Sequence, residues 1–192
     1  MLRALNDRRG MTLVELIVAL ALFAIISAVV IGFLTDSRRT YTSTSDRAHY
    51  QQSLRAVFSL LTRELRSAGC DPAETGLEAL SVCDDSILRC RMDLDGDGST
   101  LGMNPDEDIN YVYVPGTREL QRTAPDGNTM VILREVTGLQ FTYFDATGTQ
   151  LAGTPLSPDD RDRVRFVDID ITGELRSGEP VNYSTRIFLR NG

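Results

Sequence analysis

The strongest pattern in the chain is an apolar run near its N-terminus. Residues 11–34 read MTLVELIVALALFAIISAVVIGFL, and the polar residues among them are Thr12, Glu15 and Ser27. A helix of this length can cross a hydrocarbon layer of roughly 30 Å. The run is too long for an ordinary secretory signal and is followed by the charged sequence TDSRRT. We therefore expect a transmembrane segment that is not removed at its far end.

Beyond the apolar run, the pattern predicts that the helix continues to about residue 68. Prolines are absent before Pro72, and glycines are absent between Gly32 and Gly69. Residues 35–45 are rich in Ser and Thr, whose side chains compete for backbone hydrogen bonds, so we expect the helix to bend or fray there. An apolar stripe follows at steps of three and four, formed by Leu54, Val57, Phe58, Leu61, Leu65 and Ala68. The opposite, polar side carries Arg55, Thr62, Arg63, Glu64 and Arg66.

The rest of the chain predicts β-structure. Candidate strands cover residues 86–92, 109–114, 119–122, 130–135, 139–144, 164–172 and 181–189, with Pro-Gly, Asp-Gly and Thr-Gly turns between some of them. The expected core positions of the last two strands are Val167, Ile169, Ile171, Ile187 and Leu189. The sequence thus predicts an α+β fold, in which a long N-terminal helix packs its apolar stripe on one antiparallel sheet.

Charge and composition exclude several classes of function. The 20 basic residues, all Arg, are outnumbered by 27 acidic residues, and the net charge is -7. This sign disfavours non-specific binding of nucleic acid, so we expect no nucleic-acid partner. His49 is the only histidine, and no G-x-S-x-G motif occurs. We find no set of nucleophile, base and orienting group, and we predict no catalytic residues and no enzyme activity.

The first ten residues carry positive charge directly before the apolar run, with Arg3, Arg8 and Arg9 against Asp7. By the positive-inside rule, the N-terminus lies in the cytoplasm and the residues after 34 lie outside. Glu15 is unusual in such a run, because a carboxylate in lipid is costly unless it finds a partner. A plain membrane anchor does not explain this residue, so we interpret it as functional.

The segment R-R-G-M-T-L-V-E-L, residues 8–16, resembles the class III signal of type IV prepilins and type II secretion pseudopilins. In that family, a membrane-embedded aspartyl peptidase cuts after the glycine and methylates the new N-terminus. The resemblance implies cleavage after Gly10, N-methylation of Met11, where Phe is commonest, and Glu15 as the fifth mature residue. Glu15 would then neutralise the ammonium of Met11, in the same or a neighbouring chain, when helices bundle in a medium of low dielectric.

The same resemblance implies a domain plan and a location. Residues 1–10 are a cleaved leader, 11–34 the transmembrane and filament-core helix, 35–69 its amphipathic continuation, and 70–192 a β-rich extracytoplasmic head. The expected partners are prepilin peptidase, other pilin or pseudopilin subunits, and inner-membrane lipid before assembly. The expected location is the inner membrane, as a single-pass protein, and then a pilus or pseudopilus.

Three motifs from the end of the helix stripe onward indicate which kind of pilin-like subunit this is. ELRSAG near residue 66, the DLDGDG loop and VTGLQFTYF at residues 136–144 resemble PilW-like minor pilins, and the last pattern also resembles the J-type minor pseudopilin. The predicted function is a minor type IV pilin that joins a pilus at or near its tip to prime or modulate assembly. The alternatives are a minor pseudopilin of type II secretion and, in a third class, a membrane-anchored extracytoplasmic enzyme.

The acidic loop, residues 93–98, has the sequence DLDGDG, which presents oxygens as the first half of an EF-hand loop does. The twelfth position holds Asn104 in place of an acid, and no flanking helices are expected, so an EF-hand is excluded. Asp106, Glu107 and Asp108 are close enough in sequence to supply other carboxylates. Two interpretations stay open: a solvated acidic turn, or a structural Ca²⁺ site formed by Asp93, Asp95, Asp97, Asp106 and Asp108. We expect no other cofactor.

Cys70, Cys83 and Cys90 fall on the side of the membrane where disulfides can form. A bridge between Cys83 and Cys90 would close a small loop, and one between Cys70 and Cys83 a larger one. Three reduced thiols are the remaining possibility, and spacing does not choose among them.

Overall fold

The computed structural model describes residues 12–101 and 106–191, with the backbone alone at Arg39 and Ser43. The chain divides into two compact units, one ending at Ser45 and one beginning at Asp46.

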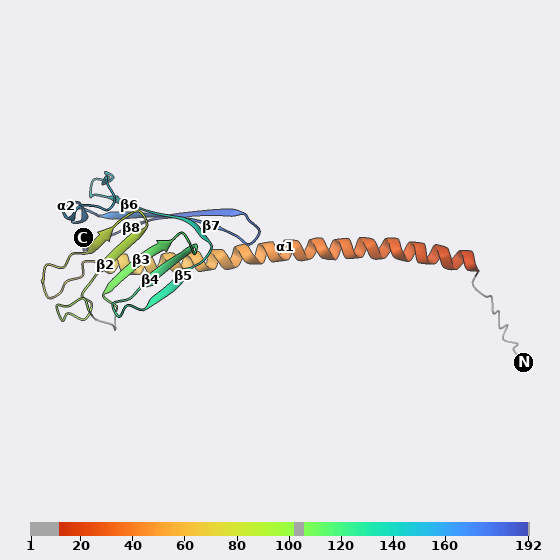
Figure 1. Ribbon diagram of the computed structural model, residues 1–192, viewed down its shortest axis with the longest axis horizontal. Coiled ribbons are helices and arrows are strands. Elements are labelled where there is room, and N and C mark those ends of the chain that lie inside the picture. The colour runs from red at the N-terminus through yellow and green to blue at the C-terminus, as the bar shows by residue number, and fades with distance from the viewer. Residues whose placement is uncertain (1–11, 102–105, 192) are drawn as a thin grey trace, which may run out of the picture. The chain divides into compact units, whose positions relative to one another are not determined.

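Helix α1 (Leu13–Ser67) is a single element of 55 residues (Figure 1). It begins after Thr12, whose side-chain oxygen accepts a hydrogen bond from the Glu15 backbone N–H at 3.3 Å. The Thr12 carbonyl accepts from the Leu16 N–H at 3.1 Å, so Thr12 is the N-cap of the helix. At the other end, Gly69 has a φ of +74°, the left-handed conformation that commonly ends a helix.

The Ser- and Thr-rich stretch does not interrupt this helix. Thr35, Thr40 and Thr44 donate their hydroxyl protons to the carbonyl four residues earlier, at 2.8, 3.1 and 2.9 Å. These side-chain bonds supplement the helical backbone bonds instead of replacing them. The prediction that the helix frays over residues 35–45 is therefore wrong.

From residue 12 onward, the first unit exposes almost all of its apolar side chains. Leu13, Phe23 and Phe33 have exposed fractions of 73%, 70% and 71%. By length and composition α1 can cross a membrane, and its most apolar window is 0% buried. Exposure on every side of the helix is what a segment surrounded by lipid or by other apolar helices requires.

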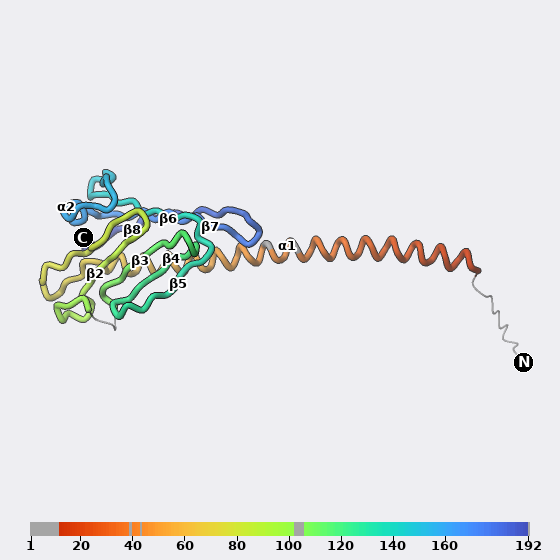
Figure 2. The backbone as a smooth tube through the Cα atoms, viewed as in Figure 1, coloured from red at the N-terminus to blue at the C-terminus, as the bar shows by residue number. Residues whose placement is uncertain are grey.

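In the second unit, the described residues form two antiparallel sheets, where the sequence predicted one (Figures 1 and 2). The first sheet has the order β1-β2-β3-β4-β5, with β1 Leu80–Cys83, β2 Ile87–Arg91, β3 Asp108–Val114, β4 Glu119–Thr123 and β5 Thr129–Leu133. The second has the order β6-β7-β8, with β6 Val136–Phe144, β7 Phe166–Glu174 and β8 Pro180–Phe188. The first sheet ends at β5 and the second begins at β6. Between them Glu135 adopts a φ of +58°, and the N–H of Val136 donates to the Arg118 carbonyl at 3.0 Å.

The sequence pattern did not predict two short elements, strand β1 and a second helix. Strand β1 pairs with β2, and its first residue lies opposite Cys90. Helix α2 (Pro158–Arg161) is a single turn whose N-cap, Ser157, accepts a hydrogen bond from the Asp160 N–H. Both are four residues long, too short to show a period in hydrophobicity.

The core of the second unit joins the C-terminal half of α1 to both sheets. The predicted stripe is confirmed, because Leu54, Val57, Leu61, Leu65 and Ala68 are buried and Phe58 is partly buried against them. The predicted core positions of the last two strands are all buried as well: Val167, Ile169, Ile171, Ile187 and Leu189. The long-helix α+β layout with antiparallel sheets is thus the one expected for a pilin-like protein.

Candidate functional site

The predicted processing site lies at the start of the chain. Gly10 and Met11 fall outside the described residues, and Glu15 is described as the acidic residue in the first turn of α1. Its side chain is exposed and stands three positions after the N-cap. A carboxylate here interacts favourably with the partial positive charge of a helix N-terminus, so Glu15 has a role in the isolated helix besides any in assembly.

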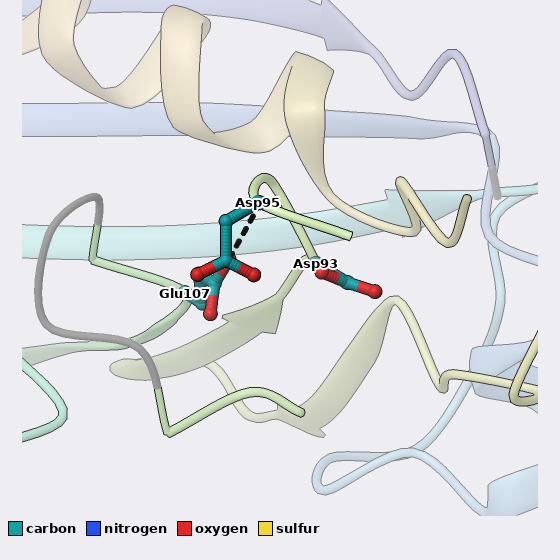
Figure 3. A group of neighbouring side chains, drawn as sticks. All are labelled: Asp93, Asp95 and Glu107. Carbon is teal, nitrogen blue, oxygen red and sulfur yellow. Dashed lines mark hydrogen bonds between the residues drawn. The ribbon is translucent and has the colours of Figure 1, made fainter. Parts of the chain in front are cut away.

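A second candidate site is the acidic loop of the head. Asp93, Asp95 and Glu107 each offer one carboxylate oxygen, and these oxygens all lie within 4.8 Å of one another. Figure 3 shows the three side chains gathered between the acidic loop and the segment that leads into β3. Asp93 and Glu107 are buried, with exposed fractions of 1% and 0%, and Asp95 is open to solvent.

Backbone hydrogen bonds hold these side chains in place. The Asp93 carboxylate accepts from the N–H groups of Gly96 and Gly98 at 2.7 and 3.0 Å, and both glycines have positive φ angles that let the loop curl around it. Oε1 of Glu107 accepts from the N–H groups of Leu94 and Asp95 at 2.7 and 3.1 Å. The loop is therefore built around two buried carboxylates.

The structure changes the predicted set of ligands. Asp93 and Asp95 come together as predicted, but Asp106 and Asp108 do not join them. Asp108 binds Arg89 at 2.6 Å and Arg91 at 3.3 Å, and Asp106 binds Arg122 at 2.8 Å.

The remaining members of the loop also differ from the prediction. Asp97 is exposed and caps the Ser99 N–H at 2.8 Å. Glu107, which the predicted set did not include, lies beside Asp93 and Asp95, whereas Asp106 and Asp108 bind arginines. Asn104, at the twelfth EF-hand position, is outside the described residues.

Glu64 was predicted on the polar side of α1, and this prediction is wrong. Glu64 is 6% exposed, and Arg122 of β4, at 8%, approaches it to 3.0 Å. The Tyr111 hydroxyl of β3 donates a hydrogen bond to the same carboxylate. Burial, together with the negative charge of Glu64, raises the pKa of Tyr111, which therefore stays protonated and continues to donate.

This buried group is a polar clamp between α1 and the first sheet. Arg122 also bonds to Asp106, and Glu64, Asp106 and Arg122 line a cavity of about 310 Å³. Burial lowers the pKa of Arg122, but the hydrogen bonds to Glu64 and Asp106 outweigh it and raise the pKa overall. The helical period places position 64 beside the stripe residues Leu61 and Leu65, and that is the one signal in the sequence for this site.

The three cysteines are free in the structure, so of the arrangements that the sequence left open it shows three thiols and no bridge between Cys83 and Cys90. Cys83 lies opposite Leu88, two residues from Cys90 along β2. Diagonal neighbours of this kind stand about 7–8 Å apart, beyond the usual reach of a disulfide. Burial raises the pKa of the Cys83 thiol to about 12 and raises that of Cys90 as well, so both are unreactive at neutral pH.

Residues 5–31 match the family described as the prokaryotic N-terminal methylation motif. This range contains Gly10, Met11 and Glu15 and runs into the apolar half of α1. No curated protein matches the chain.

The match and the long apolar helix together confirm the predicted signal of a type IV pilin-like prepilin. The motif implies processing by prepilin peptidase and assembly with other pilin subunits. It points to a structural protein, and the apolar helix behind it fits an inner-membrane anchor.

Proposed function

We propose that this protein is a minor type IV pilin. Prepilin peptidase cleaves it after Gly10 and methylates Met11. The mature subunit then leaves the inner membrane and joins a pilus at or near its tip, where it primes or modulates assembly. Its role is structural and involves no catalysis.

The observation that carries this proposal is the methylation motif over residues 5–31, continuous with a helix that is apolar and exposed as far as Leu34. An apolar surface of this extent needs either lipid or other helices around it. Lipid surrounds it before assembly, and equivalent helices surround it in a filament core. One segment thus serves as anchor and as assembly contact.

The size of the head supports a minor subunit over a major one. Major pilins and the major pseudopilin usually have shorter chains with fewer strands. The described part of this chain has eight strands in two sheets, which gives the head surface for contacts beyond those a repeating subunit needs.

A minor pseudopilin of type II secretion is the second candidate. The observation in its favour is the VTGLQFTYF segment, which forms the nine-residue strand β6 and resembles the J-type pseudopilin as well as PilW-like minor pilins. The methylation motif is common to both systems and does not separate them.

The first test is the intact mass of the protein isolated from its native membrane. We expect a mature chain that begins at Met11 and carries one methyl group on its α-amine. A Gly10→Ala variant should still be cleaved, and a Gly10→Val variant should keep its leader, because the peptidase site accepts almost no side chain there. Normal cleavage of Gly10→Val would contradict the assignment.

The second test separates the two candidates. The protein should co-isolate with pili sheared from the cell surface, and its deletion should reduce the number of pili. Loss of protein secretion with normal pili would instead identify a pseudopilin.

A further inference from the structure

We propose that Asp93, Asp95 and Glu107 bind one calcium ion, which fixes the acidic loop to the start of β3. This inference does not depend on the proposed function, because it concerns the stability of the head.

The strongest observation is an orphaned oxygen on a fully buried carboxylate. Glu107 is 0% exposed, and its Oε1 accepts two backbone hydrogen bonds. Its other oxygen, Oε2, is buried and has no hydrogen-bond partner. A buried carboxylate oxygen without a hydrogen-bond partner destabilises the fold, and a cation bound to it would offset the lost hydration.

The arginines of the neighbouring strands do not supply that cation. Arg122 is engaged by Glu64 and Asp106, while Arg89 and Arg91 are engaged by Asp108. Within the described residues, no arginine forms an ion pair with Glu107.

The carboxylates beside Glu107 make a positive charge at this place more favourable still. Asp93 is 1% exposed, and one oxygen from each of Asp93, Asp95 and Glu107 lies within 4.8 Å of the others. Like charges at this spacing repel one another, and little water separates two of them. A divalent cation among them would convert this repulsion into attraction.

The chemistry of the site fits Ca²⁺. All three side chains offer oxygen, which hard cations prefer, and the site lacks the His and Cys ligands that favour zinc. Two oxygens on one Ca²⁺, each at about 2.3–2.6 Å, can stand up to about 5 Å apart, which matches the spacing here. Asp95 is exposed, so water can complete the roughly six to eight ligands that Ca²⁺ takes.

The ion would join parts of the head that are distant in sequence. The Asp93 N–H donates to the Cys70 carbonyl at 2.7 Å, and the Gly69 N–H donates to the Arg91 carbonyl at 2.9 Å. The acidic loop is thus tied to the C-terminal end of α1 through its backbone. Ca²⁺ between the loop and Glu107 would add the start of β3 to this connection.

The test uses the full chain in detergent micelles, titrated with CaCl₂ by calorimetry and melted with and without millimolar Ca²⁺. We expect one ion per chain and a rise of several degrees in Tm that EGTA reverses, because the ion binds the folded state. The same concentration of Mg²⁺ should give a smaller rise.

Two variants test the ligands. Glu107→Gln keeps one oxygen to accept from the Leu94 and Asp95 N–H groups but puts an amide nitrogen in place of Oε2. Asp95→Asn removes the negative charge of the exposed carboxylate. Loss of a direct ligand should weaken Ca²⁺ binding by at least the roughly tenfold that loss of an outer partner costs. The matched control is Asp126→Asn, whose carboxylate caps the Asn128 N–H at 2.7 Å in a similar Asp-Gly turn, and it should bind Ca²⁺ as the wild type does.

A measurement without Ca²⁺ shows whether the variant still folds. In EGTA, Glu107→Gln should melt no lower than the wild type, since it removes an unpaired buried charge. Absence of binding heat and of a Tm rise in the wild type would overturn the proposal. So would an equal response to Mg²⁺, or an equal loss of binding in Asp126→Asn.

Discussion

The hydroxyl of Tyr50 fills the space in which a side chain on Gly173 would lie. A Cβ atom on Gly173 would be 1.8 Å from the Tyr50 oxygen and 2.5 Å from its Cζ. Tyr50 belongs to α1 and Gly173 to β7, so this contact joins the helix to the second sheet. Gly173 does not have a positive φ, and the glycine is therefore required by space and not by backbone conformation.

Gly173→Ala should destabilise the head. The ring of Tyr50 would have to move, and overpacking of this kind costs about 1–3 kcal/mol. The measurement is chemical denaturation of the full chain in micelles, followed by tyrosine fluorescence.

The control for this prediction is Gly138→Ala in β6. A Cβ there would lie 3.6 Å from its nearest neighbour, an ordinary contact, so the change should be smaller. Combining Gly173→Ala with Tyr50→Ala should cost less than the sum of the two single changes. Simple additivity would show that the two residues do not compete for this space.

The polar clamp should respond asymmetrically to substitution. Glu64→Leu leaves Arg122 buried beside Asp106 alone, and breaking a buried ion pair costs about 3–5 kcal/mol. The double variant Glu64→Leu, Arg122→Met removes both charges and should recover much of that loss. Denaturation midpoints of the wild type, the single variant and the double variant check this, with Arg55→Leu, at an exposed position of the same helix, as the neutral control. A double variant less stable than Glu64→Leu would contradict it.

Stability should fall at alkaline pH. Burial, with smaller effects of Glu135 and Tyr183, raises the pKa of Tyr50 from 10.0 to about 12. Burial raises the pKa of Cys83 from 9.0 to about 12, partly opposed by Arg161. Because folding favours the protonated forms, their contribution is complete below pH 9 and is lost as pH rises toward 12.

Denaturation between pH 8 and pH 11 measures this loss. Tyr50→Phe should reduce the decline above pH 10, since phenylalanine fills the same partly buried position without an ionisable hydroxyl. If the stability of Tyr50→Phe falls with pH as steeply as that of the wild type, other groups cause the loss. Tyr111 and Tyr143 are examples, because burial raises their pKa values too.

Short-range periodicity explains what the sequence predicted well. Leu61 and Leu65 repeat every four residues on one helix face, and Val167, Ile169 and Ile171 alternate along a strand. Each pattern follows from the geometry of its own element, so no knowledge of the partner was needed.

Pairings between distant segments could not be predicted in this way. Arg122 reaches Glu64 from 58 positions away, and apart from the place of Glu64 beside the apolar stripe no local signal indicates this pairing. The acidic loop was visible as a motif, but the choice of Glu107 over Asp106 and Asp108 depends on which arginines the neighbouring strands bring near. The division into two sheets likewise depends on one turn at Glu135.

Glu15 has two candidate roles, one at the start of α1 and one between subunits. As the third residue after the N-cap Thr12, it stabilises the start of α1 through its position in the helix. As the partner of the Met11 ammonium, it would act between helices in a filament. Glu15→Gln keeps an amide that can bond at the helix start but removes the charge, whereas Glu15→Leu removes both.

Both variants should insert into the membrane at least as well as the wild type, because a carboxylate in lipid is unfavourable. Cleavage after Gly10 should persist in both, as seen by intact mass. If Glu15 neutralises Met11 between subunits, both variants leave an unpaired ammonium at a cost of about 3–5 kcal/mol per contact and should fail to co-purify with partner subunits. Assembly of Glu15→Gln at the wild-type level, with failure of Glu15→Leu alone, would show that Glu15 acts through the helix start and not through its charge.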